Sequence, residues 1–162
     1  MNNKYQTYEI FDSPVGELLV ETDGTSIVQL KSERKANPGG KKEISLMTTR
    51  AAVQLREYFN GKRKNFDLPL KPNGTNFQRQ VWDALMEIPY GETGSYKQIA
   101  QAIDNPDAYR AVGNANNRNP IWIMIPCHRV IGADGTLTGY GGGLEMKQIL
   151  LNIEKGNKRE SI

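Results

Sequence analysis

The segment IPCHRV, residues 125–130, contains the only cysteine of the chain, Cys127, and the only histidine, His128. A free thiol has a pKa of about 8.5, so it needs a base or a positive environment to become a nucleophile. His128 is the one side chain here that ordinarily titrates near neutral pH. Arg129 follows it, and residues 108–133 contain three arginines and no acidic residue. The pattern therefore indicates a thiol that could be activated for attack.

Two interpretations of Cys127 stay open at this point. Neighbouring side chains on a regular strand point to opposite faces, so Cys127 and His128 would meet only through a bend at Pro126 or through a water. A third group would have to orient the imidazole, and Glu154 is a candidate because it lies among apolar positions of the last predicted helix. The other interpretation is a buried, unreactive cysteine in an apolar core.

The composition excludes several kinds of site. One cysteine allows no internal disulfide, and one cysteine with one histidine cannot supply the ligands of a structural zinc site. We therefore expect no metal and no cofactor. No apolar run is long enough to span a membrane and no secretion signal begins the chain, so we expect a reducing, cytoplasmic location. The net charge of +3 is only a weak indication of a nucleic-acid partner.

The elements that must position these residues fall into two parts, with a boundary near residue 72. Residues 1–72 predict short antiparallel strands, because apolar runs alternate with Gly-containing and Pro-containing turns. Apolar residues at helical spacing then predict a helix over 46–59, which Asn60 and Gly61 would end. A linker rich in proline and glycine closes this part.

Residues 73–162 predict a mainly helical domain. Two helices have capping-box residues at their starts, Thr75 with Gln78 and Ser95 with Gln98. A third helix begins after Asp107, and with the second it forms a helix-turn-helix pattern. Its small and polar residues would suit either close contact with DNA or a poorly packed surface helix.

The remaining part of this domain predicts two further elements. Residues 119–132 form an apolar run that predicts an extended segment broken by Pro126. An amphipathic helix then begins at Leu144, and Gly156 is predicted to end it.

Taken together, IPCHRV, the upstream RAVGNANNRNP and the downstream GYGGG resemble the O6-alkylguanine-DNA alkyltransferases. These DNA repair proteins are also called methylated-DNA–protein-cysteine methyltransferases. The resemblance runs from about Phe77 to Glu154, and the first part of the chain is similar to the family's less specific N-terminal domain. It implies an α+β fold, in which a small ribonuclease-H-like α/β domain precedes a winged helix-turn-helix-like, mainly α domain that carries the active site.

The resemblance also implies a mechanism of direct damage reversal. Cys127 would accept an alkyl group from O6 of guanine, or from O4 of thymine, as a stable thioether, so each molecule would act once. His128 would act as base through a water, and Glu154 would orient it. Asn119 would fix the active-site loop, and Tyr96 would crowd the phosphate 3′ to the lesion and help protonate the leaving base.

Recognition would require the damaged base to flip out of the duplex, because its alkyl carbon cannot be reached inside the stack. The implied partner is double-stranded DNA containing alkylated bases, bound by a monomer through a helix in the minor groove. Arg110 would replace the flipped base in the stack. Other residues expected near the DNA backbone are Gln78, Lys97, Asn105 and Ala133, and those expected to line the base pocket are Tyr140, Gly141 and Gly142.

The glycines of the pocket suggest the hypothesis of a roomier wall that admits larger alkyl groups. Two alternatives to alkyl transfer stay open on the residues alone. One is a winged-helix DNA-binding module in which Cys127 is structural. The other is a small cysteine hydrolase or redox thiol protein.

Overall fold

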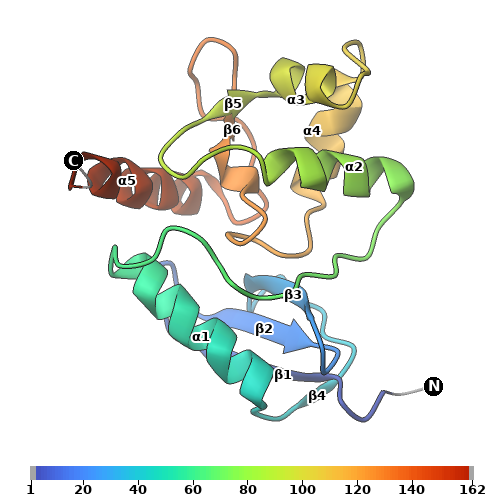
Figure 1. Ribbon diagram of the computed structural model, residues 1–162, viewed down its shortest axis with the longest axis vertical. Helices are drawn as coiled ribbons and strands as arrows, with labels where there is room; N and C mark the ends of the chain where they lie inside the picture. Colours follow the sequence, from blue (N-terminus) through green and yellow to red (C-terminus); the bar gives the residue numbers. More distant parts are fainter. Residues whose placement is uncertain (1–2, 161–162) are drawn as a thin grey trace. The chain divides into compact units, whose positions relative to one another are not determined.

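The computed structural model describes residues 3–160, which form two compact units that divide between Asn73 and Gly74 (Figure 1). The first unit is strand-rich and the second is mainly helical, which confirms the predicted α+β class. Within the described residues, no helix is long and apolar enough to cross a membrane.

The first unit is a four-stranded sheet with one helix across it (Figure 1). The strand order is β3-β2-β1-β4, with antiparallel pairs except for the short parallel pair of β1 and β4. Helix α1 packs on β1 and β2, and Leu55 and Tyr58 of the helix are fully buried with Leu18 and Leu30 of the sheet. The elements are β1 (Thr7–Phe11), β2 (Leu18–Thr22), β3 (Ile27–Ser32), β4 (Lys41–Lys42) and α1 (Leu46–Phe59).

Helix α1 follows the sequence prediction at both ends. Ser45 caps its start, because the Ser45 hydroxyl accepts from the backbone N–H of Thr48 and the Thr48 hydroxyl accepts from the backbone N–H of Ser45. The helix ends at Phe59, and Asn60 takes the C-cap position as predicted.

The second unit packs three helices against one another and adds a short parallel strand pair and a long last helix. Its elements are α2 (Asn76–Leu85), β5 (Gly94–Ser95), α3 (Tyr96–Ala102), α4 (Tyr109–Asn117), a 3-10 turn (Cys127–Arg129), β6 (Val130–Ile131) and α5 (Leu144–Glu160). Both predicted capping boxes are present, on α2 and on α3. The buried indole of Trp82 donates to the carbonyl of Ala115 at 2.9 Å, which joins α2 to α4. Helices α3 and α4 follow each other after a short turn and pack on each other, which confirms the predicted helix-turn-helix.

One helix end was predicted wrongly. Helix α5 continues through Gly156 to Glu160. Glycine disfavours a helix interior by only about 1 kcal/mol, which an otherwise favourable helix can tolerate. Helix α5 contacts the 3-10 turn directly, so it brings its own residues to Cys127 and its neighbours.

Candidate active site

The segment before Cys127 is a series of turns, so the prediction of an extended run was wrong for residues 122–129 and is confirmed only at β6. The buried Asn119 side chain organises these turns: its Oδ1 accepts from the backbone N–H of Ile121 at 2.9 Å and its Nδ2 donates to the carbonyl of Ile125 at 2.8 Å. Ile123 has a φ of 73°, a left-handed conformation that an isoleucine rarely adopts. The chain then enters the 3-10 turn at Cys127, after Pro126. The side-chain amide of Asn119 therefore holds these turns together with backbone hydrogen bonds such as that from the Ile125 N–H to the carbonyl of Ile121.

His128 is fully buried and is held by Glu154 of α5. Its Nε2 lies 2.6 Å from Oε2 of Glu154, and its Nδ1 has no hydrogen-bond partner within the described chain. Since the carboxylate accepts, Nε2 carries the proton and Nδ1 keeps its lone pair. No direct hydrogen bond joins His128 to Cys127, in agreement with the expectation that adjacency alone would not pair them. The imidazole is oriented with its basic nitrogen free.

Glu154 is shared with Arg129, which completes a buried polar cluster. Nε of Arg129 donates to Oε1 of Glu154 at 2.8 Å, and Nη2 donates to Oε2 at 3.2 Å. A third donor of Arg129, Nη1, reaches the carbonyl of Ile88 at 2.7 Å. Burial alone would raise the pKa of Glu154, but hydrogen bonds and charge interactions with His128 and Arg129 outweigh it and lower the pKa to about 2. Glu154 is therefore a carboxylate at neutral pH.

Cys127 and His128 are both uncharged at rest. Burial raises the pKa of the Cys127 thiol to about 11, against smaller opposing effects of Asn119, Lys147 and Tyr140. Burial also lowers the pKa of His128, although Glu154 acts in the opposite direction. The thiol is only 2% exposed. The resting site thus holds a neutral thiol and a neutral base, and proton transfer must accompany the reaction.

Two features of this electrostatic arrangement differ from the sequence interpretation. Arg129 does not supply free positive potential to the thiol, because Glu154 neutralises it. The cation that does act on Cys127 is Lys147, which sequence reasoning missed. Lys147 is fully buried, and its Nζ donates to the carbonyls of Val130 at 2.6 Å and of Thr138 at 3.1 Å. Its position one heptad before Glu154, on the apolar face of α5, was the available signal.

Tyr96 begins α3 and points toward the segment after β6. Its hydroxyl is hydrogen-bonded to Oγ1 of Thr138 at 2.5 Å. A Cβ at Gly113 of α4 would lie 3.7 Å from the Tyr96 ring, so the ring lies beside α4. Tyr96 therefore links α3, α4 and the glycine-rich segment, which we define as residues 132–143.

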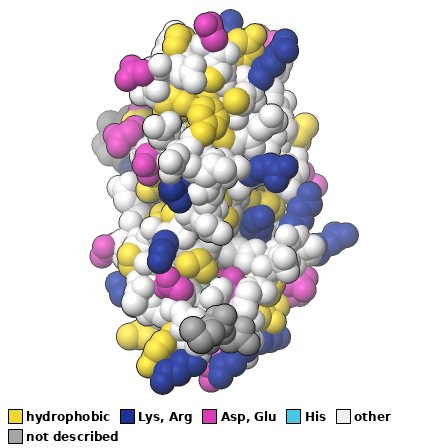
Figure 2. Space-filling view, turned by 90° about the vertical axis from the view of Figure 1, so that its right-hand side faces the viewer, with side chains coloured by type: hydrophobic (Ala, Val, Ile, Leu, Met, Phe, Trp, Pro, Cys, Tyr) yellow, Lys and Arg dark blue, Asp and Glu magenta, His cyan; other side chains and the backbone are white. Residues whose placement is uncertain are grey.

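Most of the predicted DNA-contacting residues are on the surface of the second unit. Lys97, Asn105, Arg110 and Ala133 are exposed, and the Lys97 ammonium lies 5.6 Å from the centre of the Tyr109 ring. Gln78 is only partly exposed, and its Oε1 is already used to cap α2 by accepting from the N–H of Thr75. On the face in Figure 2, basic side chains are interspersed with acidic ones and no histidine is visible, as expected for a buried His128.

The predicted pocket residues pack against aromatic and apolar neighbours. The Tyr140 ring lies 5.6 Å from that of Trp122, measured between centres. A Cβ on Gly141 would come within 3.0 Å of the Trp122 ring, and one on Gly142 would collide with Met146. Close packing thus accounts for both glycines, which argues against the hypothesis of a roomier wall.

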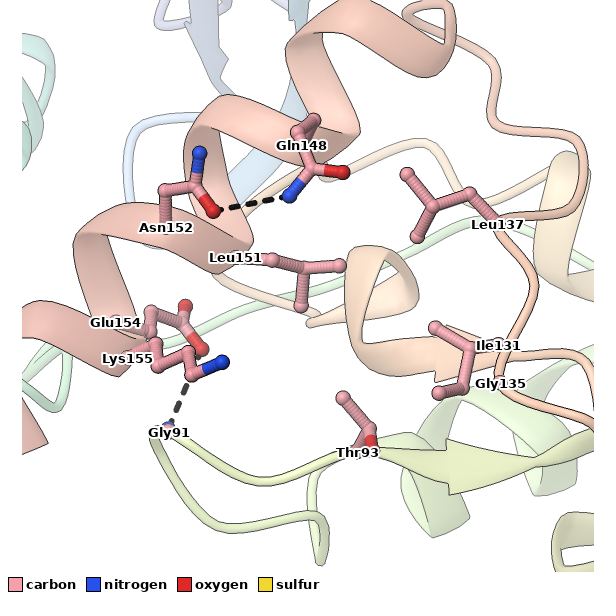
Figure 3. Close-up of a pocket in the computed structure, with 10 residues that line it drawn as sticks. All are labelled: Gly91, Thr93, Ile131, Gly135, Leu137, Gln148, Leu151, Asn152, Glu154 and Lys155. Atoms are coloured by element: carbon pink, nitrogen blue, oxygen red, sulfur yellow. Dashed lines mark hydrogen bonds between the residues drawn. The ribbon is translucent and has the colours of Figure 1, made fainter.

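A cavity of about 540 Å³ lies on another side of Glu154, between α5, the loop before β5 and the glycine-rich segment (Figure 3). Its lining combines apolar side chains such as Leu137 and Leu151 with the amides of Gln148 and Asn152, and the backbone N–H of Gly91 donates to Glu154 at its edge. Neither Cys127 nor the predicted pocket residues line it. No group of residues within 3–160 has the three or more His, Cys, Asp or Glu side chains that a metal ion would need.

Comparison with known proteins adds independent evidence. Residues 76–156 match the model of the 6-O-methylguanine DNA methyltransferase DNA-binding domain, and residues 4–72 match the ribonuclease-like domain of the same family. Methylated-DNA–protein-cysteine methyltransferases of Methanosarcina barkeri and Methanosarcina mazei are both 51% identical to this chain. The alignments cover 94% and 93% of this chain, and 99% and 98% of the two relatives.

A solved structure agrees with these sequence matches. Mycobacterium tuberculosis OGT in complex with DNA superposes with a TM-score of 0.88 at 46% identity, over 93% of this chain and 94% of that one. Both domains are matched, and their order along the chain is that of the two compact units. The chain therefore belongs to the 6-O-methylguanine DNA methyltransferase family.

Proposed function

We propose that this protein repairs DNA by transferring an alkyl group from O6-alkylguanine, and from O4-methylthymine, to its own Cys127 in a single turnover. The observation that carries the proposal is the orientation of His128. Glu154 holds Nε2 at 2.6 Å, which leaves Nδ1 as the basic nitrogen on the residue that follows Cys127, the one thiol of the chain. Family membership supports the same reaction.

In the proposed reaction, His128 Nδ1 takes the proton of the Cys127 thiol through a water. The sulfur attacks the alkyl carbon, the S–C bond forms, and the C–O6 bond breaks with its electron pair going to the guanine. Tyr96 helps protonate the leaving base by donating its hydroxyl proton to the guanine anion. The proton that His128 took from the thiol then passes to the Tyr96 oxygen, so the repaired base carries one added proton and Tyr96 and His128 are both neutral again. Glu154 stabilises the imidazolium formed in between, because its carboxylate stays ionised.

We also propose that the protein binds double-stranded DNA through α3 and α4 and flips the damaged base toward Cys127. The exposed side chains of Lys97, Asn105 and Arg110 support this role, as does the small-residue surface of α4. The Mycobacterium tuberculosis relative is described in complex with DNA. In this proposal Arg110 fills the space that the flipped base leaves, and the protein acts as a cytoplasmic monomer.

The test uses a duplex oligonucleotide with one O6-methylguanine, mixed with the protein and followed by intact mass and peptide mapping. We expect the protein to gain one methyl group on Cys127, and never more than one per molecule. Loss of the lesion with continued turnover would indicate a different enzyme. Binding without methyl transfer would indicate a DNA-binding module with a structural cysteine.

A further inference from the structure

Thr138 is bound from two sides by residues of two different helices. The Tyr96 hydroxyl at the start of α3 is 2.5 Å from the Thr138 hydroxyl. The Lys147 ammonium near the start of α5 donates to the Thr138 carbonyl at 3.1 Å. The same ammonium donates to the carbonyl of Val130, directly after the turn that carries Cys127. Thr138 is therefore linked by hydrogen bonds to α3, and through Lys147 to the end of the 3-10 turn that carries Cys127.

Residues 132–136 of the glycine-rich segment are held mainly by local turns. Gly132 N–H donates to the carbonyl of Thr136, and the Thr136 hydroxyl donates to the side chain of Asp134. Glycine is the residue with the greatest backbone freedom, and this segment has six of them. Such a segment needs long-range contacts to keep one position relative to the turn at Cys127.

Two residues after Thr138, Tyr140 is buried near the acceptor thiol. It packs on Trp122, and it is close enough to Cys127 for each side chain to alter the other's pKa. Thr138 is thus anchored by hydrogen bonds two residues before Tyr140, the residue of the segment that lies near the thiol. Movement at Thr138 would be transmitted to Tyr140 over a very short stretch of chain.

We propose that Thr138 is a positioning residue, whose bonds to Tyr96 and Lys147 hold the glycine-rich segment, and with it Tyr140, against Cys127. The inference rests on the proposed alkyl transfer for its consequence in catalysis, but the anchoring itself does not depend on it. The Thr138 hydroxyl is the replaceable part of this arrangement, because its carbonyl belongs to the backbone.

The first experiment measures anchoring without DNA. Cys127 is the only thiol, so its rate of modification by methyl methanethiosulfonate reports how often the segment opens. Thr138→Val removes the hydroxyl at nearly constant volume, and we expect modification to become about fivefold faster, the effect of losing one neutral hydrogen bond. Thr138→Ser, which keeps the hydroxyl, is expected to restore the wild-type rate.

The matched control is Thr136→Val, in the same segment, where the hydroxyl bonds only locally to Asp134. We expect its modification rate to equal that of the wild type. Equal rates for Thr138→Val and wild type, or an equal increase in Thr136→Val, would overturn the anchoring. A thermal unfolding scan of each variant separates local opening from loss of the fold.

The second experiment measures single-turnover transfer from a duplex with O6-methylguanine. We expect Thr138→Val to lower the maximal rate about fivefold and to leave the duplex concentration for half-maximal rate nearly unchanged, since the exposed side chains of α3 and α4 that are proposed to bind the duplex are untouched. In Tyr96→Phe the same substitution should have little further effect, because the partner hydroxyl is already gone. Independent, multiplying effects would contradict a shared role. A wild-type protein that takes up no methyl would refute the proposed function, and the modification rates would still decide the anchoring.

Discussion

Arg129 and Arg110 carry the same guanidinium group in opposite surroundings. Arg129 is buried and donates to Glu154 and to the carbonyl of Ile88, so its charge is compensated inside the protein. Arg110 is exposed on α4, within a stretch that has no acidic residue. A paired, buried charge orients other groups, whereas an exposed charge is available to a phosphate and is screened by salt.

The two arginines stand for two regions that do different work. In the proposed function the buried cluster around His128 fixes the direction of the proton transfer, and its burial shields it from salt. In the proposed function the surface of α3 and α4 binds the DNA, and its contribution to binding depends on ionic strength. Substitutions in the first region should therefore change chemistry and stability, and substitutions in the second should change the handling of duplex DNA.

The substitution Cys127→Ser should distinguish the two regions most clearly, because it should change methyl transfer but not DNA binding. We expect methyl transfer to be abolished, since a serine hydroxyl is a far weaker nucleophile than a thiol in this neutral setting. Affinity for duplex DNA should stay within about twofold of wild type, because the exposed residues are untouched. Intact mass and fluorescence anisotropy measure the two quantities. Persistent transfer would show that Cys127 is not the acceptor.

The next largest effect is expected from Glu154→Ala. Removing this carboxylate leaves the buried Arg129 without its counter-ion and frees His128, which we expect to reduce the free energy of unfolding by about 3–5 kcal/mol. The control is Glu57→Ala, which breaks the partly exposed ion pair with Arg63 and should cost less than about 1 kcal/mol. Urea unfolding measures both, and similar losses would refute the distinction between buried and surface pairs.

The pH dependence of stability tests the same carboxylate by protonating it instead of removing it. Glu154 has a pKa of about 2 in the folded protein and ordinarily 4.5, so its contribution is present above pH 4.5 and is lost as the pH falls toward 2. Between about pH 6 and about pH 3, wild type should lose about 2 kcal/mol more than Glu154→Gln, which cannot titrate. Parallel curves from urea unfolding at each pH would contradict the lowered pKa.

On the exposed side, Arg110→Ala is expected to slow repair in duplex DNA about tenfold, the effect of one lost stacking or phosphate contact. Reaction with free O6-methylguanine base should be almost unchanged, because no base has to be flipped. Arg118→Ala is the matched control, as Arg118 is also exposed in the acid-free stretch but lies at the end of α4. Equal slowing on both substrates would exclude a role for Arg110 in the base stack.

The smallest effect is expected from Lys97→Ala. If Lys97 contacts one phosphate, the slope of log affinity against log salt should fall by about 0.9, with little change in preference for the lesion. Lys62→Ala, an exposed lysine of the first unit, should leave the slope unchanged. Fluorescence anisotropy across a salt series measures the slope, and an unaltered slope in Lys97→Ala would remove it from the interface.

The sequence was most informative where local rules decide the structure. Apolar spacing predicted helix α1 and the helix-turn-helix. The capping boxes of α2 and α3 followed from two residue pairs, Thr75 with Gln78 and Ser95 with Gln98. The pairing of His128 with Glu154 was also anticipated, because Glu154 interrupts an apolar helix face.

The sequence was least informative where distant residues decide the structure. The turns before Cys127 depend on the Asn119 side chain, and apolar composition alone could not distinguish them from a strand. Lys147 looked like one lysine among many, and only the carbonyls of Val130 and Thr138 explain its burial. The neutralisation of Arg129 by Glu154 likewise depends on contacts far apart in the chain.

The almost complete burial of Cys127 has a consequence for the lifetime of the protein before it meets a lesion. Peroxides and common electrophiles react with thiolates, and a thiol with a pKa of about 11 in an enclosed site presents very little thiolate to them. A protein whose Cys127 reacts only once loses its activity if that thiol is oxidised first. Because the Cys127 sulfur stays protonated and buried, the thiol is protected from oxidation before the protein binds a damaged base.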